Sequence, residues 1–290
     1  YRRQRQMCIR DSPNTDELQI IGTGGNDIVS ARLIGGGSDG GSDGGSDGDS
    51  DGGTDNPQVK VIARFDVVGS DGGSDVGSDG DSDGGADIHY FDPEDIQTVN
   101  IVLCDGDDHA TLGGGSDGGS DGDSDNGGDT WYVSSLIDGG AGNDHLTGGA
   151  GADTLIGGTE DDTLSGNGGA DILLGNAGED SLDGGTGNDV LSGGRGKDKL
   201  YGRDGLDILI GGDGNDKLNG GRDNDLLIGG AMSHENDLDA LDEAVIQWVA
   251  EQDSRPSKLG ELTDDLEKDD LKGEQGNDLL AIGIGDMLKQ

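Results

Sequence analysis

The most regular feature of the sequence is an aspartate that recurs every nine residues through ten successive units. These aspartates are Asp144, Asp153, Asp162, Asp171, Asp180, Asp189, Asp198, Asp207, Asp216 and Asp225. Because no insertion interrupts the spacing, each aspartate occupies an equivalent place in a repeated backbone unit. Carboxylate oxygens are ligands of hard divalent cations such as calcium. The pattern therefore predicts rows of carboxylates that bind such cations.

Glycine dominates the residues that precede each aspartate. In the nine-residue frame that begins at Gly139, position 1 is glycine in all ten units and position 4 is glycine in eight. Glycine allows positive φ angles, so these residues predict sharp turns that point backbone carbonyls inward. At position 2, Asn167 and Asn176 also tolerate the left-handed region, whereas Arg203 does so less readily.

The elements that position these turns are short strands. Position 8 is leucine in all ten units. In an extended chain, position 8 faces inward while positions 7 and 9 face outward. One leucine per strand makes a core too thin to hold the fold without metal. We therefore expect cation binding and folding to be one event.

The unit GGxGxDxUx, in which U is apolar, resembles the calcium-binding nonapeptide of the RTX family over residues 139–228. This resemblance implies an all-β fold, a right-handed parallel β-roll or β-solenoid, in which two units form one coil. It also implies that calcium lies between successive turns on the same side, held by the aspartates and by turn carbonyls. Ten units give four gaps on each side, hence up to about eight calcium ions.

The carbonyl ligands that the resemblance implies come from glycines at positions 2 and 4. They belong to Gly140, Gly142, Gly149, Gly151, Gly158, Gly185, Gly187, Gly194, Gly196, Gly212 and Gly214.

The same resemblance implies a secreted bacterial protein that is extracellular or associated with the cell surface. Such proteins often leave the cell through a type I secretion machinery that reads a C-terminal signal. The ending GDMLKQ lacks the strongly apolar residues common in that group, which leaves the route open.

Composition and charge narrow the class of protein. The net charge is −44, only 29% of residues are hydrophobic, and 62 of 290 are glycine. A chain this acidic repels nucleic acid and anionic membranes and attracts cations. Two cysteines do not suffice for a disulfide framework, and no apolar run reaches the length of a membrane span. We expect a monomer that partners calcium ions and does not insert into membranes.

The N-terminal segment 1–12 is basic in an otherwise acidic chain. Its MCIRDS resembles the translation of a transposase end sequence found in sequencing libraries. We expect residues 1–12 to be a sequencing or cloning artefact, in which case the true N-terminus is missing.

Residues 13–138 predict a degenerate β-strand region interrupted by acidic low-complexity loops built on GGSD. The tracts run over Gly35–Asp55, Gly69–Asp87 and Gly113–Asp129. Each contains an acidic core like the start of a DxDxDG calcium loop but lacks the final glutamate. Weak calcium association and a plain solvated spacer both remain open. Asp27 and Asp108 fit parts of the repeat and are further metal candidates.

After the roll, assigned to 139–230, the segment 231–290 changes pattern. Apolar residues such as Leu238, Leu241 and Val245 share one face of a predicted helix over Asp237–Glu251. We expect this helix to cap the open end of the roll. A final partial repeat at Gly273–Ala281 makes Asp278 another metal candidate.

No catalytic constellation stands out, so we do not expect an enzyme. Gly36–Gly40 satisfies GxSxG formally, but it lies in a repetitive tract without the strand and helix that the motif needs. Two other functions stay open. The chain could be the C-terminal calcium-binding module of a secreted hydrolase or toxin whose catalytic domain is missing, or a cell-surface or matrix structural protein.

Overall fold

The structure, a computed structural model, describes the repeat region continuously and the flanking regions in part. The described residues are 8–11, 17–22, 27–34, 58–64, 87–91, 98–112, 132–232, 238–251, 262–263, 269–275, 278–281 and 287–289.

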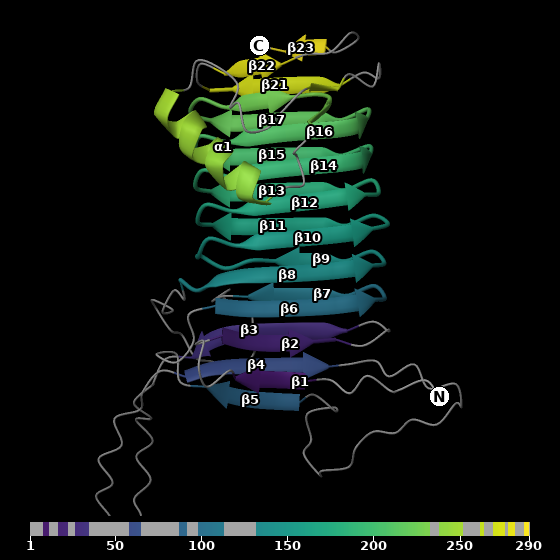
Figure 1. The fold of residues 1–290 in the computed structure, drawn as a ribbon, viewed down its shortest axis with the longest axis vertical. Coiled ribbons are helices and arrows are strands. Elements are labelled where there is room, and N and C mark those ends of the chain that lie inside the picture. The colour runs from purple at the N-terminus through teal and green to yellow at the C-terminus, as the bar shows by residue number, and fades with distance from the viewer. Residues whose placement is uncertain are drawn as a thin grey trace, which may run out of the picture.

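Within these residues the strands stack into two long sheets that face each other (Figure 1). The ten-stranded sheet contains β1 (Cys8–Asp11), β2 (Glu17–Ile21), β6 (Thr98–Asp105), β8 (Ser134–Ala141), β10 (Thr154–Thr159), β12 (Ile172–Ala177), β14 (Val190–Gly196), β16 (Ile208–Gly214), β18 (Leu226–Ile228) and β22 (Leu279–Ala281). The eleven-stranded sheet contains β23 (Met287–Lys289), β21 (Asp270–Glu274), β17 (Lys217–Arg222), β15 (Lys199–Asp204), β13 (Ser181–Thr186), β11 (Thr163–Gly168), β9 (His145–Thr147), β7 (His109–Leu112), β3 (Ile28–Ile34), β4 (Gln58–Arg64) and β5 (Asp87–Phe91).

The pairing register follows the nine-residue repeat. Strand β10 pairs in parallel with β8 and β12, which places Leu155 between Ile137 and Leu173. Consecutive units thus alternate between the two sheets, and eighteen residues separate equivalent positions in one sheet. The predicted parallel β-roll is confirmed.

The core is a single column of apolar side chains between the sheets. The position-8 leucines, from Leu146 to Leu227, are at most 1% exposed. The column continues upstream through Leu18 and Val99 and downstream through Leu271. Through the regular units it is one side chain wide per strand, as expected from the sequence, whereas the upstream strands β2, β3, β6 and β7 each contribute two or three, such as Val99, Ile101 and Leu103 on β6.

The roll begins well before the regular repeats. Strands β2 and β6 precede β8 in one sheet, and β3 and β7 precede β9 in the other, all in parallel. The antiparallel strands β1, β4 and β5 close this end. Residues 35–57, 65–86 and 113–131 connect β3 to β4, β4 to β5 and β7 to β8, so almost all of the GGSD tracts lies outside the described residues.

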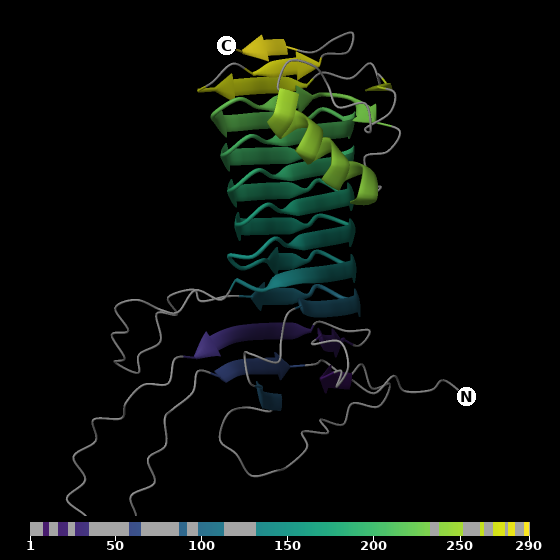
Figure 2. The ribbon, with the colours of Figure 1, turned by 60° about the vertical axis from the view of Figure 1, so that its left-hand side comes forward.

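The predicted C-terminal helix is confirmed as α1 (Leu238–Glu251), but its expected position over the open end is wrong. Figures 1 and 2 show α1 lying along the side of the stack, while β21, β22 and β23 continue the roll at its end. Leu241 and Ala244 pack against the outer face of the ten-stranded sheet. The helix packs there because alternate units carry apolar residues on their outer face, such as Ile208 and Ile210 at positions 7 and 9. Packing of α1 buries this apolar face.

No helix in the described ranges is long and apolar enough to cross a membrane.

Candidate metal centre

The aspartates of successive coils form two hydrogen-bonded rows, one along each edge of the roll. In each row the backbone N–H of one aspartate donates to the Oδ1 of the aspartate one coil later, as from Asp171 to Asp189 at 2.9 Å. We name the rows the long ladder and the short ladder. The long ladder consists of Asp27, Asp108, Asp144, Asp162, Asp180, Asp198, Asp216 and Asp269. The short ladder consists of Asp153, Asp171, Asp189, Asp207, Asp225 and Asp278.

The second carboxylate oxygen of most ladder aspartates is buried and receives no hydrogen bond from the described protein atoms. These Oδ2 atoms belong to Asp108, Asp144, Asp162, Asp171, Asp180, Asp189, Asp198, Asp207 and Asp225. Burying a charged oxygen without a partner is costly, so native structures rarely leave one in that state. A bound proton or a bound cation would neutralise each of these buried carboxylates.

Burial changes the acidity of these groups accordingly. It raises the pKa of Asp180 to about 6, that of Asp189 to about 7, that of Asp171 to about 8 and that of Asp207 to about 9. Backbone N–H groups of neighbouring aspartates act against this shift, and burial outweighs them.

Glycine at position 1 makes room for the carboxylates. A Cβ atom on Gly184 would overlap Oδ2 of Asp189. The carboxylate thus packs directly on the backbone of its own turn, which explains why position 1 is always glycine.

Backbone carbonyls approach the same edges from the preceding coil. At position 4, the carbonyl oxygen of Gly169 points at the Cα of Gly187, whose φ of 138° suits glycine. At position 2, the carbonyl oxygen of Asn176 points at Gly194 in the same way. Each edge therefore combines carboxylate and carbonyl oxygens in a repeating order. This is the donor set that calcium prefers.

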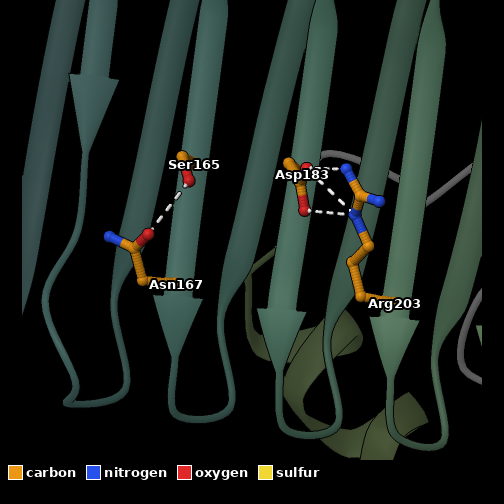
Figure 3. A network of polar contacts seen from close by, with 4 residues as sticks. All are labelled: Ser165, Asn167, Asp183 and Arg203. Carbon is orange, nitrogen blue, oxygen red and sulfur yellow. Dashed lines mark hydrogen bonds and ion pairs between the residues drawn. The ribbon is translucent and has the colours of Figure 1, made fainter.

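The exceptional position-2 residues still adopt the turn conformation. Asn167 and Asn176 have φ angles of 72°, and Arg203 has 87°. The side chain of Arg203 bonds with its Nε to the carboxylate of Asp183 at 2.9 Å, as Figure 3 shows beside the contact between Ser165 and Asn167. Arg203 thus combines a positive φ angle, which is unfavourable for a residue other than glycine, with an ion pair on the outer face of the roll.

One predicted site departs from the others. Asp153 accepts hydrogen bonds from both the backbone N–H and the hydroxyl of Ser135 on Oδ1, and from the backbone N–H of Gly149 on Oδ2. Gly149 also lacks the positive φ found at position 2 of the other turns. At the start of the short ladder, protein donors thus already satisfy the carboxylate.

The three candidates outside the regular units all lie in the ladders. Asp27 bonds through its N–H to Asp108, Asp108 to Asp144, and Asp225 to Asp278. Sequence reasoning missed Asp269, which is 2% exposed and accepts the N–H of Asp216 at 2.9 Å. A step of nine residues back from Asp278, with Leu271 nine before Leu280, would have revealed it.

The residues at these edges fit calcium better than metals that prefer nitrogen or sulfur. Across the described ranges, no three His, Cys, Asp or Glu side chains gather as a metal-binding group. Ligation would have to draw on one or two carboxylates with several backbone carbonyls, and hard cations accept such oxygen shells.

Comparison with known proteins agrees with this reading. The family model described as the RTX calcium-binding nonapeptide repeat matches four times, at residues 136–164, 165–200, 174–209 and 201–231. Neither a curated protein nor a solved structure matches the chain significantly.

Proposed function

Residues 136–231 belong to the RTX calcium-binding nonapeptide repeats, and from this premise we propose that the chain folds as its two aspartate ladders bind calcium. The chain would remain expanded where calcium is scarce and order itself where calcium is abundant, which fits an extracellular location. Export by a type I machinery, a monomeric state and the absence of catalysis belong to the same proposal.

The buried Oδ2 atoms are the observation that carries this proposal. A carboxylate such as that of Asp189 is fully buried, and its Oδ2 receives no hydrogen bond in the described structure. Bound calcium would supply positive charge between successive turns. Asp171, Asp189 and the carbonyls of the intervening glycine turns would hold it there, in place of the apolar interior that the roll lacks.

The ladders suggest where binding is strongest. Interior steps have a complete turn on both sides, whereas the carboxylate of Asp153 is already bonded to Ser135 and Gly149. We therefore place the tightest sites between Asp162 and Asp216 and weaker ones at the ends. We propose that the regular units bind up to about eight calcium ions. The ladder steps at Asp108, Asp269 and Asp278 would provide further sites.

The test is a calcium titration of the full chain followed by far-ultraviolet circular dichroism. Calcium should produce a cooperative gain of β signal, and magnesium should substitute poorly because it demands a stricter octahedral shell. Asp189→Asn should shift the calcium midpoint upward by roughly tenfold to a hundredfold, since a lost charged ligand costs roughly 1.5–3 kcal/mol.

Asp213→Asn is the matched control, because Asp213 is exposed at position 3 of a turn and belongs to neither ladder. Its midpoint should equal that of the parent. A β signal that is unchanged by a calcium chelator would contradict the proposal.

A further inference from the structure

The last turn of the long ladder is assembled from two pieces of chain that lie far apart in sequence. After β18, Gly229 takes the place of position 1, because its carbonyl oxygen accepts the N–H of Gly212 at 3.2 Å and lies against Gly211 as its counterparts do in earlier coils. The sixth place of the same turn is filled by Asp269, which accepts the N–H of Asp216. Residues 231–268, which include α1, are thus inserted inside a ladder turn.

The ends of this insertion are held together by the protein backbone. Strands β19 (Ala231–Met232) and β20 (Leu262–Thr263) pair antiparallel, with Ala231 opposite Thr263. Met232 is 3% exposed and packs in the same apolar cluster as Leu241 and Ala244 of α1. The neck of the insertion is therefore continuous with the helix packing.

Both ladders cross this insertion at their final step. Asp216 bonds to Asp269, and Asp225 bonds to Asp278, and the partners are 53 positions apart in the sequence in each case. Asp225 is fully buried, and its Oδ2 atom receives no hydrogen bond from the described residues. The final step of the short ladder thus presents the same unsatisfied oxygen as the interior steps.

We propose that divalent cations bound at the Asp216–Asp269 and Asp225–Asp278 steps lock the insertion into the roll and thereby control the docking of α1. This inference rests on the proposed calcium binding, and it adds two sites that join the matched family region to Asp269 and Asp278 beyond it, together with a regulated element. Without cations at these steps, like charges would face each other across the split turn, which loosens the neck and releases α1 from the ten-stranded sheet. The helix would then dock last, after the interior coils have formed.

The experiment is a calcium titration of the full chain with two readouts in parallel. Far-ultraviolet circular dichroism follows the roll, and hydrogen exchange with mass spectrometry follows amide protection in Leu238–Glu251. Asp269→Asn is compared with Asp213→Asn, because the side chain of Asp213 is exposed and belongs to neither ladder. In Asp269→Asn, helix protection should require at least about fivefold more calcium, while the circular dichroism midpoint moves by less than about twofold. Asp213→Asn should match the parent in both readouts.

Equal shifts of the two readouts in Asp269→Asn would overturn the proposal, because Asp269 would then be one more member of a uniform ladder. Helix protection at parent calcium concentrations would overturn it as well. Failure of the calcium-binding proposal looks different, since neither readout would respond to calcium in the parent chain.

Discussion

At the scale of single residues, the ladder aspartate performs three tasks with one side chain. Its Oδ1 accepts a backbone N–H from the preceding coil, its Oδ2 packs on the first glycine of its own turn, and its N–H donates to the next coil, as Asp189 shows. In the folded roll, this hydrogen bond fixes the orientation of the carboxylate. The proposed calcium site would use the Oδ2 atom, which this hydrogen bond leaves without a partner among the described residues.

Because the pKa values are raised, the stability of the calcium-free fold and its affinity for calcium should depend on pH in opposite ways. Burial raises the pKa of Asp207 to about 9 and that of Asp189 to about 7, from an ordinary value of 3.8. The calcium-free folded chain therefore binds more protons than the unfolded chain between about pH 4 and about pH 9, so its stability falls as pH rises through that window. Calcium competes with those protons, so calcium affinity should rise with pH over the same range.

Circular dichroism in the presence of a chelator should show more β signal at pH 5 than at pH 8. Calorimetric titration should show tighter calcium binding at pH 8. A chelated chain that gains order as the pH rises would refute this coupling.

At the scale of elements, the roll has two unlike outer faces. The eleven-stranded sheet presents polar residues such as Ser181 and Lys217, whereas the ten-stranded sheet presents Ile172, Ile208 and Leu226 beneath α1. The helix thus supplies a second apolar cluster beside the thin inner column. Coils beneath the helix gain stability that coils upstream of it lack.

Removal of the helix contact should destabilise the calcium-loaded protein. Leu241 is fully buried against the sheet, so Leu241→Ala should lower the free energy of unfolding by about 2–5 kcal/mol. Ile246 lies on the same helix and is 71% exposed, so Ile246→Ala should change it by less than about 0.5 kcal/mol. Urea unfolding at saturating calcium measures both, and equal effects of the two substitutions would show that α1 does not brace the roll.

The elements also show where sequence reasoning succeeds and where it stops. A strict period predicted the coil, the inward leucine and the turn aspartate, because each unit repeats the same local physics. The position of α1 was missed because it depends on the alternation of units between sheets, which places aliphatic residues at position 7, at position 9 or at both in every second unit only. Asp269 was missed because the insertion between Gly230 and Asp269 breaks the frame, although spatial pairing restores it.

At the scale of the whole molecule, charge sets the balance between expanded and folded states. A net charge of −44 favours expansion, and the thin core offers little to oppose it. Calcium would lower this charge along the two edges of the roll, where the ladder carboxylates are buried. Under the proposed function, charge neutralisation would then drive folding as much as burial does.

This balance between charge repulsion and burial predicts that the chain contracts strongly when calcium binds. Small-angle scattering with a chelator should give a radius of gyration approaching about 60 Å, as for an unfolded chain of this length, and calcium should reduce it to less than about half. Magnesium at equal ionic strength serves as the control for simple screening and should cause only a small contraction. Equal contraction by both ions would argue against specific sites.

The eighteen-residue offset between equivalent strands has a consequence for fidelity of assembly. Since neighbouring coils are nearly interchangeable, a slip by one full coil would preserve most leucine contacts and ladder bonds. Only irregular features can prevent such a slip. They are the two hydrogen bonds that Ser135 donates to Asp153, the apolar cluster against which α1 packs, and the last long-ladder turn, which is split after Gly229. These departures from the repeat would therefore fix a single pairing register in an otherwise uniform chain.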